Sequence, residues 1–522
     1  MEKRSRGIRK GRRGAGRSAG ERTAAVAKAV SQLPWTLPVN PDRPTEPLDE
    51  DGVNAIHHGA MRVLEEIGID FINEEAKSIL REAGATVSTD SDTVRMDRDF
   101  VMEQVGKAPS SFTITPRNPD HTITIGGRNM VFVNVSSPPN YSTLDGGRKV
   151  GDRAAYQDLI KLTQYFNCIH LAGGYPVEPV DIHASIRHLD CLYDKLTLTD
   201  KAVHAYSLGK ERVEDVMEMV RIAGGLTQAE FDATPRMFTN INSSSPLKHD
   251  FPMLDGAMRL ARHGQPVFVT PFTLSGAMAP VTLPGAVMQQ TAEGLAAIVL
   301  LQVINPGTPV VYGSFTSNVD MKSGSPAFGT PEYLRATQLS GQMARFYGLP
   351  LRASNACAAN YPDSQSAWES AFSLWACVSA RTNVVYHAAG WMEGGLCASY
   401  EKFVMDCETL QQMIHYMRPM SASEGELAFE AIKEVGPTGH FFGTAHTLER
   451  YETAFYAPFL SDWSNFESWE ERGSVTTPER ANKVWKQILA EFEAPPMDDA
   501  SREELEAFVE RRKREGGAPT DF

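Results

Sequence analysis

Large aromatic side chains recur in this sequence within or directly after short β-rich runs. Phe272 ends the run PVFVTPF, Tyr312 lies in PVVYGSF, and Tyr386 lies in NVVYHAAG, with Trp391 just beyond it. Ring faces attract a cation that has no N–H donors, because the π-electrons stabilise its charge without hydrogen bonds. We therefore expect Tyr312, Phe272, Tyr386 and Trp391 to contact a small quaternary ammonium ion. The alternative for each ring taken singly is that it only fills the core.

Acidic and polar side chains follow the last two of these runs. Glu393, in GWMEGGL, is the main carboxylate after NVVYHAAG, and Asp363, in YPD, follows the run LPLRASN. A carboxylate beside a bound cation would balance its charge. We expect Glu393, Asp363 and His387 to be the catalytic residues. We expect Asn355 or His387 to bind a substrate carboxylate if the substrate has one.

Other active-site chemistries have less support. The first β-rich run holds no His-x-His for a metal hydrolase, and His183 and His188 fall in a predicted helix, where they are expected to pack. No cysteine near a strand end has a second cysteine or a histidine at the spacing of a zinc site. A glycosidase needs two acids at strand ends, and Asp363 with Glu393 keeps that alternative open.

These side chains need a scaffold that brings strand ends together. From residue 131, short apolar runs alternate with helical patterns and return roughly every 30–45 residues. Eight such units with nearly all-apolar strands predict a (β/α)8 barrel of the TIM type, whose sites lie at the carboxyl ends of the strands. A doubly wound open sheet is the structural alternative. The runs are VFVNVS (131–136), IHLAGGY (169–175), AVHAYS (202–207), RMFTNINS (236–243), PVFVTPF (266–272), PVVYGSF (309–315), LPLRASN (349–355) and NVVYHAAG (383–390).

The two ends of the chain differ from this pattern. A Pro-rich strap, amphipathic helices and the hairpin pair FTITP and TITIGG predict an N-terminal α+β elaboration. We therefore divide the chain into a disordered basic tail (1–33), this α+β region (34–130), a barrel catalytic domain (131–470) and a C-terminal helical extension (471–522). The pattern leaves open whether VFVNVS is the first barrel strand or HFFGTAH (440–446) is the last.

Composition and charge narrow the class of protein. Of the 522 residues 42% are hydrophobic, as in a folded enzyme, and the net charge of −14 opposes binding to nucleic acid through phosphate contacts. Residues 1–30 hold ten Lys and Arg, so the tail is expected to be a solvated basic segment. The most apolar stretch (294–304) falls short of the ~18 residues of a membrane span. Six cysteines without a C-x-x-C pair suit buried thiols in the cytoplasm.

Seven segments between about residues 48 and 470 carry a family resemblance. They read AMRVLEEIGIDF (60–71), ILREAGATV (79–87), KAPSSFTITPRNPDHTITIGG (107–127), PPNYSTLDGGRKVG (138–151), GTPEYLRATQLSGQMARFYGLP (329–350), GGLCASYEKFVMDCETL (394–410) and GHFFGTAHTLERYETAFYAP (439–458). On these segments the chain resembles the trimethylamine methyltransferase family, whose members move a methyl group from a methylated amine to a corrinoid protein. The segments occur in the same order as in the family, and the basic tail lies outside the resemblance.

This resemblance implies a (β/α)8 barrel with an N-terminal elaboration and a separate corrinoid-binding protein. The archetypal members carry pyrrolysine in the region that here reads NACAANYPDSQSAWES (355–370), where this chain has standard residues only. In this respect the chain looks like the large non-pyrrolysine branch, some of whose members use glycine betaine or related quaternary amines.

The expected function is methyl transfer from a small quaternary amine, similar to glycine betaine, to the Co(I) corrinoid of a partner protein. We expect no tightly bound cofactor, because the partner supplies the cobalamin or other corrinoid, and we expect no metal, membrane or nucleic-acid partner. A homo-oligomer is the default expectation. The alternatives are a betaine-binding or regulatory barrel without turnover, and a barrel hydrolase or lyase acting on another small cation.

Overall fold

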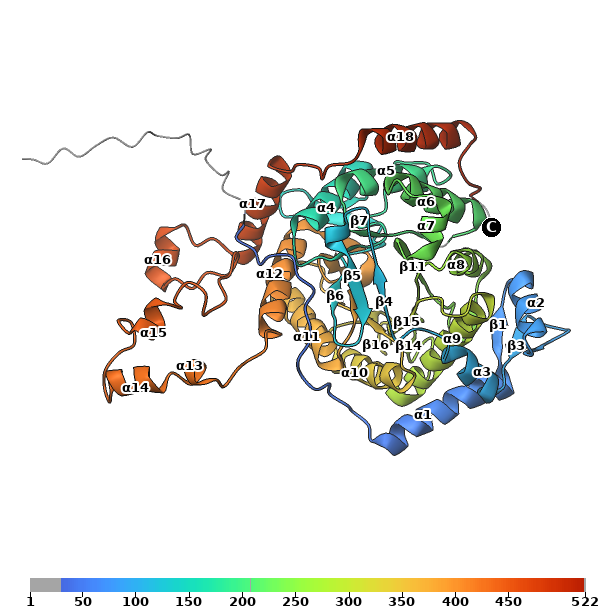
Figure 1. The fold of residues 1–522 in the computed structure, drawn as a ribbon, viewed down its shortest axis with the longest axis horizontal. Helices are drawn as coiled ribbons and strands as arrows, with labels where there is room; N and C mark the ends of the chain where they lie inside the picture. The colour runs from blue at the N-terminus through green and yellow to red at the C-terminus, as the bar shows by residue number, and fades with distance from the viewer. Residues whose placement is uncertain (1–29, 207, 521–522) are drawn as a thin grey trace, which may run out of the picture.

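Eight short parallel strands form the centre of the molecule (Figure 1). The computed structural model describes residues 30–206 and 208–520. The strands pair in the order β6-β19-β18-β15-β13-β11-β10-β9, and a parallel bridge from Val133 to Leu171 joins the two ends of the sheet. The predicted (β/α)8 barrel is therefore confirmed. Its strands are β6 (Val131–Phe132), β9 (Leu171–Ala172), β10 (Ala202–His204), β11 (Met237–Ile241), β13 (Val267–Val269), β15 (Val310–Gly313), β18 (Leu351–Ser354) and β19 (Val384–Tyr386).

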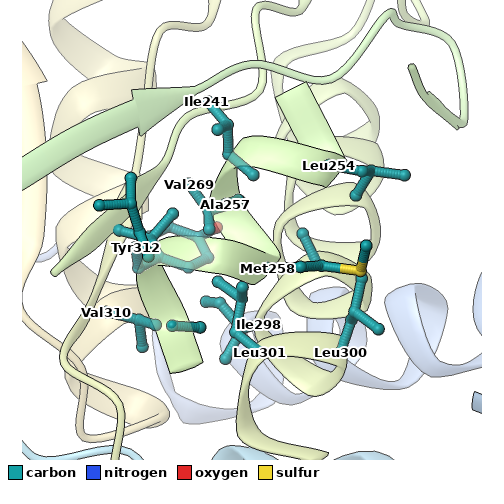
Figure 2. Packing of buried hydrophobic residues seen from close by; sticks show 14 of the residues in the cluster. Ile241, Leu254, Ala257, Met258, Val269, Ile298, Leu300, Leu301, Val310 and Tyr312 are labelled. Carbon is teal, nitrogen blue, oxygen red and sulfur yellow. The ribbon is translucent and has the colours of Figure 1, made fainter. Parts of the chain in front are cut away.

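Helices surround the barrel, because each strand is followed by a segment whose apolar residues face inward. Between strands and helices lies an apolar layer in which Ile241, Val269 and Val310 pack against side chains of two helices (Figure 2). The helices that follow the strands are α4 (Arg153–Tyr165), α5 (Arg187–Leu198), α6 (Lys210–Ala223), α8 (Phe251–Arg262), α9 (Leu283–Ile304), α10 (Pro331–Phe346), α11 (Ser364–Ala380) and α12 (Tyr400–Tyr416).

Helix α9 is longer than the apolar stretch singled out in the sequence. Its 22 residues are long and apolar enough to cross a membrane by length and composition, but most of the helix is buried inside the molecule. A helix that is apolar on all sides is typical of the core of a large protein. We therefore regard α9 as a core helix.

A β-hairpin closes the amino-terminal end of the barrel. Strands β4 (Ser111–Ile114) and β5 (Ile123–Gly126) pair antiparallel, as the sequence predicts. Their alternate residues Phe112, Ile114, Ile123 and Ile125 are buried against the first inward-facing residues of the barrel strands. Because side chains alternate along a strand, one face of the hairpin covers the barrel and the other does not.

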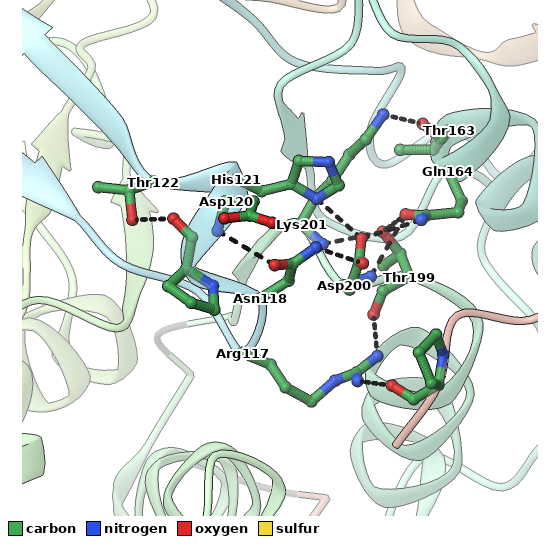
Figure 3. Close-up of polar contacts among 12 residues, drawn as sticks. Arg117, Asn118, Asp120, His121, Thr122, Thr163, Gln164, Thr199, Asp200 and Lys201 are labelled. Carbon is green, nitrogen blue, oxygen red and sulfur yellow. Dashed lines mark hydrogen bonds and ion pairs between the residues drawn. The ribbon is translucent and has the colours of Figure 1, made fainter. Parts of the chain in front are cut away.

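A polar network holds the tip of this hairpin on the barrel (Figure 3). Asp200, next to β10, accepts hydrogen bonds from Asn118 Nδ2 and Gln164 Nε2, each at 2.9 Å, and lies 2.8 Å from His121 Nδ1. Burial raises the pKa of Asp200, but these hydrogen bonds and His121 outweigh burial and hold the pKa well below its ordinary value. The ionised carboxylate therefore ties the hairpin tip to the base of the barrel.

The rest of the N-terminal region is an α+β elaboration, also as predicted (Figure 1). Strand β1 pairs in parallel with β12, which follows β11 of the barrel, so this region is continuous with a barrel loop. The elements are α1 (Glu50–Arg62), β1 (Ile69–Phe71), α2 (Glu74–Glu82), β2 (Thr86–Val87), β3 (Thr93–Arg95), α3 (Arg98–Val105) and β12 (Lys248–His249).

Short accessory strands extend from the carboxyl ends of the barrel strands. They form two small sheets, β14-β16-β17 and β20-β21-β7-β8. The sequence GGRKVG (146–151) therefore belongs to the hairpin of β7 and β8. The bounds are β7 (Asn140–Thr143), β8 (Gly147–Val150), β14 (Leu274–Ser275), β16 (Ser317–Val319), β17 (Pro326–Ala327), β20 (Trp391–Met392) and β21 (Cys397–Ser399).

The structure decides one assignment that the sequence left open and corrects another. HFFGTAH forms turns and the start of a short helix, so β6 at residue 131 is the first barrel strand. His183 precedes α5, whereas His188 lies within it and bonds Asp215 at 2.8 Å. Residues 1–29 of the predicted basic tail lie outside the described residues, and the division into domains stays a prediction.

The C-terminal part of the chain leaves the barrel and returns to it (Figure 1). Four short helices extend away from the barrel after α12. Helix α17 then packs against α12 and α4, and α18 packs against α5 and α6. The bounds are α13 (Glu424–Leu427), α14 (Phe429–Val435), α15 (Ala445–Leu448), α16 (Phe466–Glu471), α17 (Thr477–Ala490) and α18 (Asp499–Arg514).

Candidate functional site

A cavity of about 240 Å³ lies at the carboxyl ends of the barrel strands. This is the end at which barrel enzymes place their active sites, because the loops that follow the strands converge there. Its lining combines aromatic rings, amides and imidazoles with one guanidinium. The residues are Ser136, Ser137, His204, Tyr206, Leu208, Asn240, Asn242, Met253, Phe272, Phe315, Arg352, Tyr386, His387, Trp391 and Gly395.

Four rings form one wall of the cavity. Phe272 stacks on Phe315 with ring centres 5.1 Å apart, and His387 stacks on Trp391 at 5.2 Å. Phe315 meets Trp391 edge to face at 6.0 Å and so joins the two pairs. This contiguous aromatic surface can stabilise a methylated ammonium ion, which needs ring faces and no hydrogen-bond acceptors.

Arg352 brings a buried positive charge into the cavity, next to the aromatic wall. On β18 it pairs with Val384, so by alternation it points into the barrel as Val384 and Tyr386 do. The guanidinium lies 4.7 Å from the centre of the Tyr386 ring and 5.4 Å from that of Phe315. Burial lowers the pKa of Arg352 to about 10, which leaves it charged at neutral pH.

The guanidinium has few partners of its own. Nη1 donates one long hydrogen bond, 3.4 Å, to the Ser314 carbonyl, and Nε has no partner within the described residues. Among the residues that the structure describes, no carboxylate lines the cavity. A buried charge without a counter-ion costs several kcal/mol, so a ligand carboxylate here would supply both the missing charge and the missing acceptors.

The two histidines of the cavity are neutral. Burial, and then the nearby cations, lower the pKa of His204 and of His387 well below the ordinary value. His204 Nε2 accepts a hydrogen bond from the Asn240 backbone N–H at 3.1 Å, so the proton of its ring is on Nδ1. His387 has a φ of 55°, in the left-handed region, directly after β19. Neither imidazole is an acid at neutral pH.

A second cavity of about 370 Å³ adjoins the first. The two share Ser137, His204, Tyr206 and Leu208 as lining residues. The Tyr206 hydroxyl bonds Ser137 Oγ at 2.7 Å and accepts from the Tyr175 backbone N–H at 3.1 Å, which fixes the ring between the two spaces. The Tyr206 side chain, fixed by these hydrogen bonds, therefore bounds the first cavity on the side of the second.

Four of the eight predicted site residues line the cavity: Phe272, Tyr386, His387 and Trp391. Tyr312 does not, because its neighbour Val311 points into the barrel and Tyr312 points outward into the helix layer (Figure 2). There its hydroxyl bonds Thr291 Oγ1 at 2.7 Å and accepts from Gln290 Nε2 at 3.2 Å.

The other three predicted residues have local partners outside the cavity lining. Glu393 accepts from Arg148 Nε at 2.9 Å, two residues from the lining residue Gly395. Asp363 is the N-cap of α11 and accepts from two backbone N–H groups of that helix. The Asn355 amide donates to the Ala388 carbonyl at 3.1 Å. The structure therefore does not bring the two predicted acids to the rings.

Arg352, the main charged group of the cavity, was not among the residues predicted from the sequence. A signal was present, because Arg352 interrupts the otherwise apolar run LPLRASN. Arginine is almost never fully buried without a partner, and Arg352 is only 3% exposed. His204, in AVHAYS, is a second buried polar residue that the same criterion would have found.

Comparison with known proteins shows what the chain is similar to. A family model described as trimethylamine methyltransferase (MTTB) matches residues 12–517. The chain is 38% identical to the glycine betaine methyltransferase of Desulfitobacterium hafniense (strain Y51), over 90% of this chain and 98% of that protein. It is 28% identical to the trimethylamine methyltransferase MttB of Desulfitobacterium hafniense (strain DSM 10664 / DCB-2), over 90% and 94%. It is also 28% identical to the proline betaine:corrinoid methyltransferase of Eubacterium limosum, over 88% and 96%.

Proposed function

The chain belongs to the trimethylamine methyltransferase family and is a methyltransferase; we propose that its donor is a small quaternary amine bearing a carboxylate, of the glycine betaine type. Its methyl acceptor is the Co(I) corrinoid of a partner protein. The observation that carries this proposal is the presence, in one cavity, of an aromatic wall and a buried arginine without a carboxylate partner among the described residues.

The two parts of the donor match the two parts of the cavity. The trimethylammonium group of the donor lies against Phe272, Phe315 and Trp391. The carboxylate of the donor lies against Arg352 and the side-chain amides of Asn240 and Asn242. A guanidinium can hold a carboxylate with two parallel hydrogen bonds. A simple methylated amine would place a second positive charge beside Arg352 and gain no such bonds, so the cavity selects against it.

Methyl transfer from such a donor needs no proton. The electron pair of Co(I) forms the new bond to the methyl carbon, and the pair of the broken C–N bond stays on nitrogen, which leaves as a neutral tertiary amine. The neutral state of His204 and His387 agrees with a reaction that uses neither an acid nor a base.

The protein's contribution is therefore positioning. The rings and Arg352 replace the water around a zwitterion and fix its direction, so that one methyl group faces the barrel mouth. Holding reactants in an attack geometry contributes several kcal/mol to a rate. We assign Phe272, Tyr386, His387 and Trp391 to substrate contact on this basis and give Tyr312 no such role.

The names of two relatives support this assignment of donor and acceptor. One relative is a glycine betaine methyltransferase and another a proline betaine:corrinoid methyltransferase. We place the enzyme in the cytoplasm, since all six cysteines are free and buried.

The test is a visible-spectrum assay with chemically reduced Co(I) cobalamin and a panel of donors, with the demethylated product identified by NMR. Glycine betaine should give methylated cobalamin and dimethylglycine in equal amounts. Tight binding of betaine with no transfer, even in the presence of a corrinoid protein, would favour a binding protein instead.

A further inference from the structure

The segment between α12 and α17 exposes an unusual amount of apolar surface. We call residues 418–476 the arm; only Thr444 and Leu460 within it are buried. Eleven of its large apolar side chains are 45–100% exposed. They are Met420, Leu427, Phe429, Ile432, Phe441, Phe442, Leu448, Tyr451, Phe455, Trp463 and Phe466.

This surface is too large for a segment that stands alone in water. Seven of the eleven side chains are aromatic, and each aromatic side chain presents about 150–250 Å², so their exposed area is on the order of 700 Å² or more. The largest apolar patch of a typical monomer is roughly 300–600 Å². The arm projects away from the barrel (Figure 1) and has almost no buried side chains of its own. Ordering its helices therefore requires another surface.

A second uncovered apolar surface lies on helix α11. Trp368, Phe372 and Trp375 follow one another at spacings of four and three residues, so they share one face of the helix. They are 52%, 52% and 44% exposed. We call these three residues the α11 stripe.

The α11 stripe and the arm are continuous. Trp375 contacts Tyr416, the last residue of α12, with ring centres 5.1 Å apart, and the fully exposed Met420 of the arm follows four residues later. A symmetric pair of chains could thus cover both surfaces at once, because the base of each arm lies beside the stripe that the other arm would cover.

The arm begins at the end of the barrel opposite the cavity. Helix α12 starts near the mouth, where the Ser399 backbone N–H bonds the Gly390 carbonyl, and ends where Tyr416 bonds Asp42. Asp42 in turn accepts from Arg381, at the end of α11 and ahead of β19. The base of the arm and Trp375 therefore lie away from the mouth. A carrier that delivers a corrinoid must approach the mouth, so a second copy of this chain is the better occupant for the arm.

We propose that the arm and the α11 stripe form an interface between two copies of this chain, with the arm of each copy packed on the stripe of the other. Two such contacts related by a twofold axis would bury an area comparable to the ~1,200–2,000 Å² of a standard stable interface. The inference does not depend on the substrate proposed above.

The first test compares masses in solution by light scattering and sedimentation velocity. Wild-type chain should have twice the 57.4 kDa of one copy. Trp368→Glu with Phe372→Glu, and separately Phe442→Glu with Phe455→Glu, should each shift the mass toward one copy. The control is Ile67→Glu, which is 56% exposed but outside both surfaces and should leave the dimer intact.

All substituted residues are exposed, so circular dichroism should confirm that each variant is folded. A wild-type chain that is monomeric at every concentration would overturn the proposal. This holds also if the monomer were found to use its arm to bind a corrinoid protein. A dimer that survives both double substitutions would overturn it as well.

The second test asks whether the arms are exchanged. All six native cysteines are buried, so a bismaleimide should react with introduced surface cysteines. Trp368→Cys and Phe442→Cys chains, co-expressed with different tags, should form a cross-link that contains both tags. A chain that carries both Trp368→Cys and Phe442→Cys and cross-links only within itself would contradict arm exchange. Equally strong cross-links between two Trp368→Cys chains, or between two Phe442→Cys chains, would contradict it as well.

Discussion

The Arg352 guanidinium lies 4.7 Å from the centre of the Tyr386 ring, and both side chains line the cavity at the barrel mouth. The contact aligns the guanidinium but leaves its positive charge uncompensated, because a ring face is not a counter-ion. A cavity built this way attracts an anion to Arg352 and a methylated cation to the rings beside it. The proposed choice of donor rests on this pairing.

Removing the charge at Arg352 should weaken binding of glycine betaine by about 10- to 100-fold, since a charged hydrogen bond contributes about 1.5–3 kcal/mol. The variant is Arg352→Met, and the measurement is calorimetric Kd. Tetramethylammonium, which has no carboxylate, should bind the variant at least as well as wild type. The Kd of Arg352→Lys for glycine betaine should lie between those of wild type and Arg352→Met, because lysine keeps the positive charge but lacks the paired N–H donors of the guanidinium. Equal losses for both ligands would mean that Arg352 only supports the fold.

Removing a ring from the wall should weaken binding of either cation. Phe272→Ala or Trp391→Ala should cost about 0.5–2 kcal/mol for glycine betaine and for tetramethylammonium alike. Tyr312→Phe is the matched control: it should lower the free energy of unfolding by about 0.5–1.5 kcal/mol through its lost hydrogen bonds and leave Kd unchanged. If Tyr312→Phe weakened binding more than Trp391→Ala did, the assignment of the wall would be wrong.

Binding should be flat from pH 6 to 9 and should fall as pH rises through about 10. The cavity histidines have pKa values well below the ordinary value and do not titrate in the flat range. Arg352, with a pKa of about 10, loses its charge above that pH, whereas the pKa of Tyr206 is raised to about 12. Titrations of Kd at constant ionic strength check this, and Arg352→Met should abolish the fall. A transition near pH 6.5 would place a charged histidine in the site.

Replacing Glu393 by Gln should change Kd for glycine betaine by less than about threefold, the size of a weak exposed ion pair. Glu393 bonds Arg148, whose side chain is half exposed, and does not line the cavity. The same holds for Asp363, which caps α11. A loss of tenfold or more in Glu393→Gln would restore this carboxylate to the substrate site.

The alternation of apolar runs and helices predicts the barrel well, because buried parallel strands and amphipathic helices have distinct periods. Strand positions also identify Phe272, Tyr386, His387 and Trp391. The direction of a side chain, however, depends on the strand's register, and a shift of one residue sends Tyr312 outward and Val311 inward. Arg352 was not predicted because its run was treated as one of the nearly all-apolar barrel strands. The exposed arm leaves no periodic pattern that distinguishes it from a barrel unit.

The most direct test of the central claim is methyl transfer to Co(I) cobalamin from glycine betaine compared with choline. Both carry a trimethylammonium group on a two-carbon chain. Glycine betaine has a carboxylate where choline has a hydroxymethyl group. If Arg352 recognises the carboxylate, transfer from glycine betaine should exceed transfer from choline by about 100-fold in kcat/KM, or roughly 2.7 kcal/mol. Equal transfer from the two donors, or faster transfer from choline, would contradict the account.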